Sequence, residues 1–390
     1  MKYRTKLVAG LLASVLVFAG CAATGTSSSE ASATSPTTTT ATTDSTTTSQ
    51  TTTTTETTAF SVDVDWSSLP TTNVTLTDDG LVITEAGTYV LTGSTTGQVR
   101  VESDGYVRII LDGVTIASSD GAAIQVDSAE LTVLELADGS VNTVSDAATR
   151  SDEEIDGAVY SSDDLYITGT GTLNVTAGFA DGIVGKDDLW IDSGTINVTS
   201  VDDGIRGKDS LTVSGGTITI DATGDGMKSS NDTDLGKGQL AITGGTITIT
   251  TGDDAIKAEQ ALQITGGTID IVSSVEGIEA PVIVIDGGDI SLNASDDGIN
   301  ASASEIITEG LSITINGGNL TIVMGSGDTD AIDSNGDLTI TGGTLNITAQ
   351  SPFDFDGTGT LTGGTITVNG QQVTELTNQM MGGGGGRGGR

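Results

Sequence analysis

Short runs in which apolar and polar residues alternate recur along most of the chain. Four of them read LTVSGGTITI at 211–220, LAITGGTITI at 240–249, LQITGGTIDI at 262–271 and LTITGGTLNI at 338–347. Alternation with a period of two predicts β-strands that carry Ile, Leu and Val on one face and Thr on the other. A third short run, such as DGIRGK at 203–208, follows an acidic residue. Each unit of the chain therefore predicts three short strands joined by turns.

The unit repeats with an acidic residue at the same corner each time. The successive spacings between these corners are 22, 22, 29, 22, 21 and 33 residues, and the two long steps contain polar insertions near 229–237 and 302–310. No unit can bury its apolar face alone, but stacked units can if each strand pairs in parallel with its equivalent one turn later. We predict an all-β fold, a right-handed parallel β-helix of about 22 residues per turn, with the hand taken from other parallel crossovers. A β-sandwich is the alternative, whereas a propeller blade needs about 40 residues.

The two ends of the chain differ from this repeat. Three cations near the start precede the apolar run Leu7–Ala19, which ends in FAGC. We interpret residues 1–20 as a lipoprotein signal peptide and Cys21 as the lipidation site; an ordinary signal peptide is the alternative. Residues 21–58 are a Thr/Ser-rich sequence that predicts a disordered tether, 59–376 the β-helix domain, and 377–390 a Gly/Arg flexible tail. These features predict an extracytoplasmic protein held at the bacterial membrane or cell surface by its lipid alone.

Composition and charge narrow the range of partners. The formal net charge is −39, so nucleic acid and bare anionic membranes would be repelled, and divalent cations are attracted. The chain has no His and one Cys, which excludes most zinc, copper and haem sites, an internal disulfide and a Ser-His nucleophile pair. We expect a monomer that binds a polysaccharide.

Stacking places the corner residues in one column. Successive turns lie about 4.8 Å apart, and two charges at about 5 Å repel by roughly 3 kcal/mol. Basic residues that follow the corners screen this charge but are too few to neutralise it (Lys186, Arg206, Lys208, Lys228 and Lys257). Hard oxygen ligands favour Ca²⁺, and the candidate ligands are Asp181, Asp202, Asp203, Asp225, Asp253, Asp254, Glu276, Asp296, Asp297 and Asp330. We expect Asp354 and Asp356 to continue the column. The alternative is that Asp stabilises its own turn by bonding its own backbone.

The ordered series of motifs resembles a family of secreted bacterial β-helix proteins, the carbohydrate-binding domain-containing proteins. It runs through SSDGAAIQV, LADGSVNTVSDA, DGAVYSSDDL, DGIVGKDDL, DDGIRGKDSLTVSGGTITI and GDGMKSSN. The resemblance covers about residues 60–370 and implies bound calcium and binding of polygalacturonate and cellulose. It also implies a fold similar to β-helix pectate lyases, in which carboxylates hold Ca²⁺ and a Lys is the base. The positions that match are Asp202, Asp203, Asp225, Asp253 and Asp254 for the ligands, and Lys228 or Lys257 for the cation.

Three functions remain open at this stage. The first is a non-catalytic, calcium-dependent protein that binds acidic plant cell-wall polysaccharide such as polygalacturonate. The second is a polysaccharide lyase, and the third is a surface adhesin. Sugar modules for neutral glucans present aromatic platforms, but we expect the few candidate aromatics to pack in the core or the cap (Trp66, Tyr160, Tyr166, Phe179 and Trp190). The sequence therefore favours an acidic polymer over cellulose.

Overall fold

The computed structural model describes residues 63–325 and 329–378. The predicted signal peptide, Cys21, the tether at 21–58 and nearly all of the tail lie outside these residues. The described residues belong to one compact unit. Within the described part, no helix has both the length and the apolar character needed to cross a membrane.

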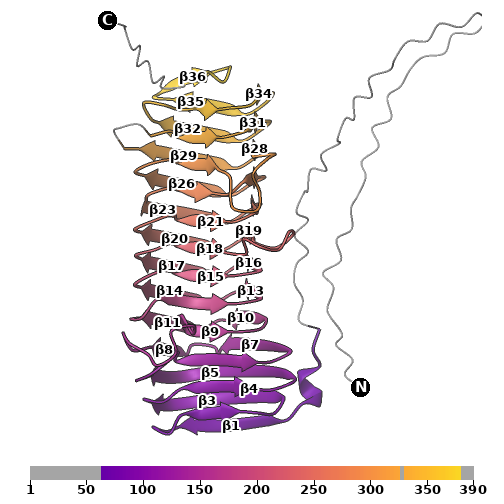
Figure 1. Ribbon diagram of the computed structural model, residues 1–390, viewed down its shortest axis with the longest axis vertical. Coiled ribbons are helices and arrows are strands. Elements are labelled where there is room, and N and C mark those ends of the chain that lie inside the picture. Colours follow the sequence, from indigo (N-terminus) through magenta and orange to yellow (C-terminus); the bar gives the residue numbers. More distant parts are fainter. Residues whose placement is uncertain (1–62, 326–328, 379–390) are drawn as a thin grey trace, which may run out of the picture. The chain divides into compact units, whose positions relative to one another are not determined.

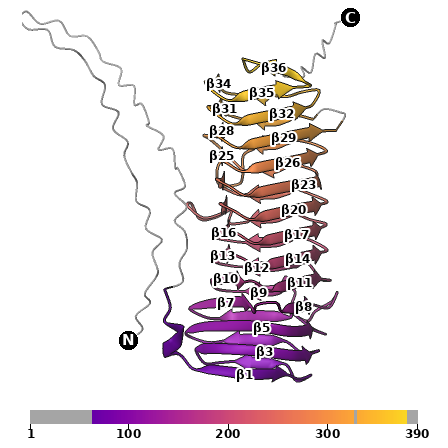
Figure 2. The same cartoon turned by 180° about the vertical axis from the view of Figure 1, so that it is seen from behind.

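The described residues form three ribbons of parallel strands that the chain visits in turn (Figures 1 and 2). One turn contains β12 of ribbon 1, β13 of ribbon 2 and β14 of ribbon 3, and each strand pairs with its equivalent on the next turn. This confirms the all-β class and the predicted parallel stacking of turns. The hand of the coil stays a prediction.

The strand bounds follow the three ribbons. Ribbon 1 contains β2 (Leu81–Ile83), β4 (Val99–Glu102), β6 (Ile124–Ser128), β9 (Gly157–Ser161), β12 (Asp181–Gly185), β15 (Ile205–Gly207), β18 (Met227–Ser229), β21 (Ile256–Ala258), β24 (Ile278–Glu279), β27 (Ile299–Ala301), β30 (Ile332–Ser334) and β33 (Asp354–Phe355). Ribbon 2 contains β7 (Leu131–Leu136), β10 (Leu165–Gly169), β13 (Asp188–Ile191), β16 (Ser210–Val213), β19 (Gln239–Ile242), β22 (Ala261–Ile264), β25 (Val282–Ile285), β28 (Ser312–Ile315), β31 (Asp337–Ile340) and β34 (Gly359–Leu361). Ribbon 3 contains β8 (Val141–Ser145), β11 (Thr172–Ala177), β14 (Thr195–Ser200), β17 (Thr217–Ala222), β20 (Thr246–Thr251), β23 (Thr268–Ser274), β26 (Asp289–Ala294), β29 (Asn319–Met324), β32 (Thr344–Thr348) and β35 (Thr365–Val368).

The remaining elements lie at the two ends. They are the 3₁₀ helix η1 (Trp66–Ser68) and the strands β1 (Thr71–Leu76), β3 (Gly87–Thr95), β5 (Tyr106–Ala117) and β36 (Gln371–Val373). The long strand β5 pairs with both β7 and β8, so ribbons 2 and 3 start from one strand. At the other end β36 pairs antiparallel with β35.

The registers align equivalent side chains through successive turns. Ile183 pairs with Ile205, and Ile205 with Met227, each 22 positions further along the chain. All three side chains are fully buried in one continuous apolar core. Because alternate residues point outward, the same registers also align polar side chains on the surface.

Gly-Gly pairs turn the chain from ribbon 2 into ribbon 3. At Gly245 the backbone has φ +96°, a conformation that favours glycine. At Gly244 an added Cβ would lie 2.4 Å from the carbonyl oxygen of Ser214 on the preceding turn. Glycine therefore lets the backbones of successive turns stack closely at this edge.

Candidate functional site

The predicted corner residues line the edge between ribbon 3 and ribbon 1, where they form a hydrogen-bonded ladder. The backbone N–H of Asp203 donates to Oδ1 of Asp181 at 3.1 Å, and that of Asp225 donates to Oδ1 of Asp203 at 2.8 Å. The N–H of Asp254 donates to Oδ1 of Asp225 at 3.0 Å. All four side chains are buried. The alternative in which each Asp bonds its own backbone is therefore wrong for these turns, because the bonded N–H belongs to the next turn.

The same type of hydrogen bond between turns recurs near the C-terminal end, where the last partner is a serine in place of the expected Asp354. The N–H of Asp330 donates to Oδ1 of Asp297 at 2.9 Å, and the hydroxyl of Ser351 donates to Asp330. Ser351 thus occupies the corner that follows Asp330. Asp354 pairs in register with Asp333 instead. The expectation that Asp354 continues the corner column is wrong, because it lies three residues beyond the corner.

A second row, here called the outer column, follows the outward-facing centre of ribbon 1. Consecutive registers join its members, which are Arg206, Lys228, Lys257, Glu279, Asn300, Asp333 and Asp354. Its first three members are cations, and the later ones are carboxylates with one amide. The charge of the outer column therefore changes sign along the coil.

The cations of the outer column neutralise the first turns of the ladder. Nε of Arg206 donates to Oδ2 of Asp181 at 2.8 Å. Nζ of Lys228 lies 2.6 Å from Oδ2 of Asp225. Each of these carboxylates thus uses one oxygen for the next turn and the other for a cation.

The other predicted cations have different surroundings. Nζ of Lys257 lies 2.7 Å from Oδ2 of Asp254 and also bonds Glu279. Lys186 lies 3.1 Å from Asp156, a carboxylate on the turn before Asp181 that Arg206 also contacts. Lys208 makes no ion pair within residues 63–325 and 329–378. Of the five predicted basic residues, the structure brings Arg206, Lys228 and Lys257 to the corner carboxylates.

Several acidic groups of the site, on both sides of Lys257, keep protons more strongly than free carboxyl groups do. Burial foremost raises the pKa of Asp181 and that of Asp254 to about 7, although Arg206 and Lys257 bond them. Burial foremost, and then the charges of Glu279 and Asp254, raise the pKa of Glu276 to about 8. Burial is also the main cause that raises the pKa of Asp297 to about 6. Burial and the charge of Asp297 raise the pKa of Asp333 to about 7. Burial is thus the main cause on both sides of Lys257, and what distinguishes the later turns is that Glu279, Asn300 and Asp333 take the place of a cation in the outer column.

An amide within this region has an oxygen without a donor. Asn300 is 7% exposed, and its Nδ2 donates to Oε2 of Glu276 at 3.0 Å. Its buried Oδ1 accepts no hydrogen bond among the described residues. A hard cation prefers carboxylate and amide oxygens as ligands. The oxygens of Glu276 and Asn300 are therefore suitable ligands for Ca²⁺.

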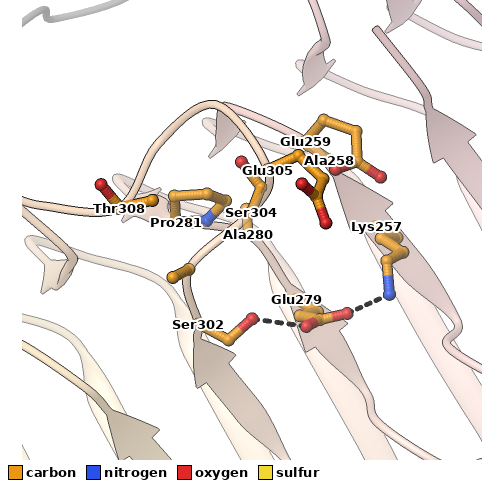
Figure 3. Close-up of a pocket in the computed structure, with 11 residues that line it drawn as sticks. Lys257, Ala258, Glu259, Glu279, Ala280, Pro281, Ser302, Ser304, Glu305 and Thr308 are labelled. Carbon is orange, nitrogen blue, oxygen red and sulfur yellow. Dashed lines mark hydrogen bonds and ion pairs between the residues drawn. The ribbon is translucent and has the colours of Figure 1, made fainter. Parts of the chain in front are cut away.

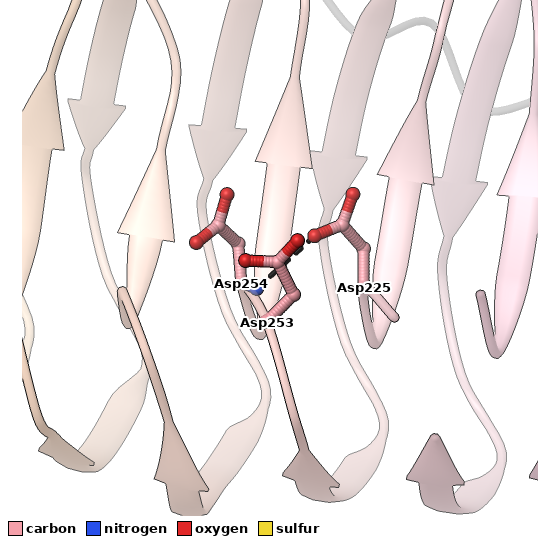
Figure 4. Close-up of side chains that lie close together, drawn as sticks. All are labelled: Asp225, Asp253 and Asp254. Atoms are coloured by element: carbon pink, nitrogen blue, oxygen red, sulfur yellow. Dashed lines mark hydrogen bonds between the residues drawn. The ribbon is translucent and has the colours of Figure 1, made fainter. Parts of the chain in front are cut away.

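Two groups of three carboxylates each bring ligand oxygens within 4.8 Å of one another. The first is Asp225, Asp253 and Asp254, on two adjacent turns (Figure 4). The second is Asp254 with Glu276 and Glu279; sequence reasoning missed Glu279 because it stands at a position held by a cation on earlier turns. Asp202 and Asp296 are exposed and lie outside both groups.

A shallow hollow of about 370 Å³ opens beside the second group. It lies between ribbon 1 and the inserted segment near 302–308, and Lys257, Glu259, Glu279 and Glu305 face it (Figure 3). The hydroxyl of Ser302 donates to Oε1 of Glu279 at 2.5 Å and fixes that carboxylate. The insertion that lengthens this repeat therefore builds one wall of a concave, acidic surface.

A second acidic edge, between ribbons 1 and 2, was not predicted. The N–H of Asp188 donates to Oδ1 of Asp164 at 3.2 Å, and the hydroxyl of Ser210 donates to Oδ1 of Asp188 at 2.6 Å. Burial, and then the charge of Asp188, raises the pKa of Asp164 to about 7. The signal was in the sequence, because SDDL, KDDL and KDSL occupy the same place in successive repeats.

Two of the aromatic residues do not pack in the core as expected. Tyr166 and Trp190 pair in register at outward-facing positions of ribbon 2 and are partly exposed. Tyr160 is 6% exposed and packs against Val184, as expected for a core residue. Phe179 lies against the guanidinium of Arg150, 4.3 Å from the ring centroid.

The fold and the site define a solenoid of parallel strands with rows of carboxylates along its edges. The family of carbohydrate-binding domain-containing proteins matches residues 77–328 and 273–379, and the chain belongs to this family. The predicted resemblance is thereby confirmed, and the family supports a polysaccharide as the partner.

One curated relative and one solved structure are similar to the chain. A carbohydrate-binding domain-containing protein of Acetivibrio thermocellus is 33% identical over 124 residues, which are 30% of this chain. The match spans 43% of that protein's length. A solved structure, the polysaccharide lyase-like protein from C. thermocellum as a gadolinium derivative, is 33% identical with a TM-score of 0.49. That comparison covers 58% of this chain and 88% of the other.

Proposed function

We propose that this chain is a non-catalytic binding protein that holds Ca²⁺ on its acidic edge and through it binds acidic polysaccharide such as polygalacturonate. The observation that carries the proposal is the change of sign in the outer column after Lys257. The ladder is neutralised by side chains up to that point. Beyond it, the outer column has Glu279, Asn300 and Asp333 in place of cations, and Asn300 has a buried oxygen without a donor.

A calcium ion would neutralise carboxylates of the protein and would also let an anionic polysaccharide bind beside them. The residues that would hold it are Glu276, Asp297, Asn300 and Asp333, together with Asp254 and Glu279, which share their charge with Lys257. A polyuronate would be repelled by a chain with a formal charge of −39. When bound, Ca²⁺ supplies positive charge that carboxylates of the protein and of the sugar can share.

A lyase is the second candidate, because Lys257 adjoins a group of three carboxylates beside the hollow. Elimination needs a base that is free of its proton at working pH. Burial alone would lower the pKa of Lys257, but hydrogen bonds to Asp254 and Glu279 and their charges raise it far above its usual value. The Nζ of Lys257 is therefore held as an ammonium, which argues against a role as base. Ultraviolet absorbance from an unsaturated uronate product would favour the lyase.

The direct test is retention of the full chain on immobilised polygalacturonate with Ca²⁺ or with a chelator. We expect retention with Ca²⁺ and its loss with the chelator. Equal retention under both conditions would show that calcium does not bridge the protein and the polysaccharide. No retention under either condition would show that polygalacturonate is not the partner.

The proposed location is the extracytoplasmic side of the bacterial membrane, with a monomeric, right-handed coil carried on a tether from lipidated Cys21. The support is the order of signal, Cys and Thr/Ser-rich sequence. Metabolic labelling with a fatty-acid analogue tests it: the label should enter the wild type and be absent from Cys21→Ser.

A further inference from the structure

Lys257 places an ammonium group among the carboxylates of the second group of three. Its Nζ lies 2.7 Å from Oδ2 of Asp254 and also bonds Oε2 of Glu279, the contact drawn in Figure 3. Asp254 and Glu279 are two of the three members of that group, and both side chains are largely buried. The oxygens with which these two residues would bind calcium therefore already bind a cation.

The third member of the group, Glu276, has no such partner. It makes no ion pair within residues 63–325 and 329–378. Its Oε2 accepts from Nδ2 of Asn300 at 3.0 Å, while the buried Oδ1 of Asn300 accepts no hydrogen bond from any residue that the structure describes. One positive charge thus serves three carboxylates, and a divalent cation can compensate them better than Lys257 does.

The hollow beside this group offers the ammonium group of Lys257 a second position. Lys257, Glu259 and Glu305 line the hollow, which has a volume of about 370 Å³ (Figure 3). Burial raises the pKa of Glu259, and the charge of Lys257 is the main cause that opposes this shift, so the two groups are close enough to interact. Neither glutamate makes an ion pair in the described part of the chain. A lysine head on its flexible four-carbon stem can therefore turn into the hollow and find carboxylates there.

We propose that Lys257 is a tethered competitor of calcium, and that calcium binding moves its ammonium group from Asp254 and Glu279 into the hollow, against Glu259 and Glu305. Two cations in contact with the same oxygens repel each other, so the ion and Lys257 exclude one another there. Lys257 remains protonated, and only its position changes.

The exchange regulates the proposed calcium site and rests on the proposed function. Without calcium, Lys257 compensates two buried carboxylates and holds adjacent turns together. With calcium, the ion must first displace it, which lowers the affinity of the site. The glutamates of the hollow reduce this cost because they give the displaced ammonium group new partners.

The test is a calcium titration of the full chain by calorimetry, with the melting temperature in chelator as the second measurement. Lys257→Met keeps the apolar stem and removes the competitor. We expect its dissociation constant for calcium to fall by about tenfold or more, and its melting temperature in chelator to fall because Asp254 and Glu279 lose their cation. Lys208→Met makes the same change in net charge at a residue without an ion pair in the described ranges, and it should match the wild type in both measurements.

A second pair of variants tests the hollow and leaves the three carboxylates intact. Glu259→Gln combined with Glu305→Gln weakens the acceptors for the displaced ammonium group and should raise the dissociation constant for calcium severalfold. Glu153→Gln combined with Glu154→Gln removes two exposed carboxylates from another turn and is the control, which should bind calcium as the wild type does. This pair decides the question if Lys257→Met does not fold.

The possible failures of the two proposals differ. If Lys257→Met, or the double variant of the hollow, binds calcium with the affinity of the wild type, the exchange is wrong and the proposed calcium site stands, held by ligands that Lys257 does not contact. If neither the wild type nor any variant binds calcium, the proposed function fails and this inference fails with it.

Discussion

Oδ1 of Asp181 accepts the backbone N–H of Asp203 at 3.1 Å, while Oδ2 of the same carboxylate accepts from Nε of Arg206 at 2.8 Å. One side chain therefore joins two turns of the coil and also binds a cation. Asp225 repeats the arrangement with the N–H of Asp254 and with Lys228. These two interactions explain why an acidic residue recurs at the corner. The hydrogen bond from the next turn needs only an acceptor, whereas the bond to the cation needs a negative charge.

The two uses can be separated by substitution of Asp225. Asp225→Ala leaves the buried N–H of Asp254 without an acceptor and should lower the free energy of unfolding by about 1–3 kcal/mol. Asp225→Asn keeps the acceptor and loses only the charge, and Lys228 still has Asp203 at 3.7 Å. Urea unfolding should therefore show a clearly smaller loss for Asn than for Ala. Equal losses would mean that the charge, and not the ladder, is what stabilises the corner.

The stability of the metal-free protein should fall as pH rises from about 5 to 8. Glu276, Asp333 and Asp297 have folded pKa values of about 8, about 7 and about 6, all above their unfolded values near 4. Across this range the folded state binds more protons than the unfolded state, so the free energy of unfolding decreases with pH. The melting temperature in chelator, measured at pH 5 and pH 8, checks this.

Calcium should reverse that loss by replacing the protons. The increase in melting temperature on adding Ca²⁺ should therefore be larger at pH 8 than at pH 5. Glu276→Gln, which removes the group with the highest of these pKa values, should reduce the difference between the two pH values. The same calcium shift at both pH values would show that these carboxylates do not hold the ion.

A cation placed in the outer column should substitute for calcium. Asp333 pairs in register with Asn300 and Asp354, and Lys at 333 would repeat the arrangement of Lys257 among its carboxylates. Asp333→Lys should raise the melting temperature in chelator and weaken calcium-dependent retention on polygalacturonate. Asp270→Lys makes the same change in net charge at an exposed position of ribbon 3 and is the control. If both variants behave alike, general charge and not the column is responsible.

The repeat was sufficient to predict the stacking of turns but not the bonds between them. A period near 22 predicts that Ile183, Ile205 and Met227 lie in one buried row. The strand registers pair these three residues on successive turns, as predicted. The ladder could not be predicted, because a backbone N–H has no signature in the sequence. The wrong expectation for Asp354 has a related cause. The strand register places Ser351 at the corner after Asp330, although an acidic residue was expected there.

The aromatic pair shows a different limit of sequence reasoning. The candidate aromatic residues were expected to pack in the core or the cap, but the face to which a side chain points depends on its place in the alternation of a strand. Tyr166 and Trp190 each stand between two buried residues of their strands and must point outward. The same alternation that predicted the strands therefore also predicts that these two side chains lie on the outer face.

Close stacking of backbones at the Gly-Gly turns gives a final prediction. A Cβ at Gly244 would lie 2.4 Å from the carbonyl oxygen of Ser214, a contact that only movement of a turn can relieve. Gly244→Ala should therefore lower the free energy of unfolding by about 1–3 kcal/mol. The control is Gly178→Ala, where the nearest atom, the amide nitrogen of Ala148, is 3.4 Å away. Urea unfolding of the two variants checks this, and a loss at residue 244 no larger than at 178 would show that the edge yields easily.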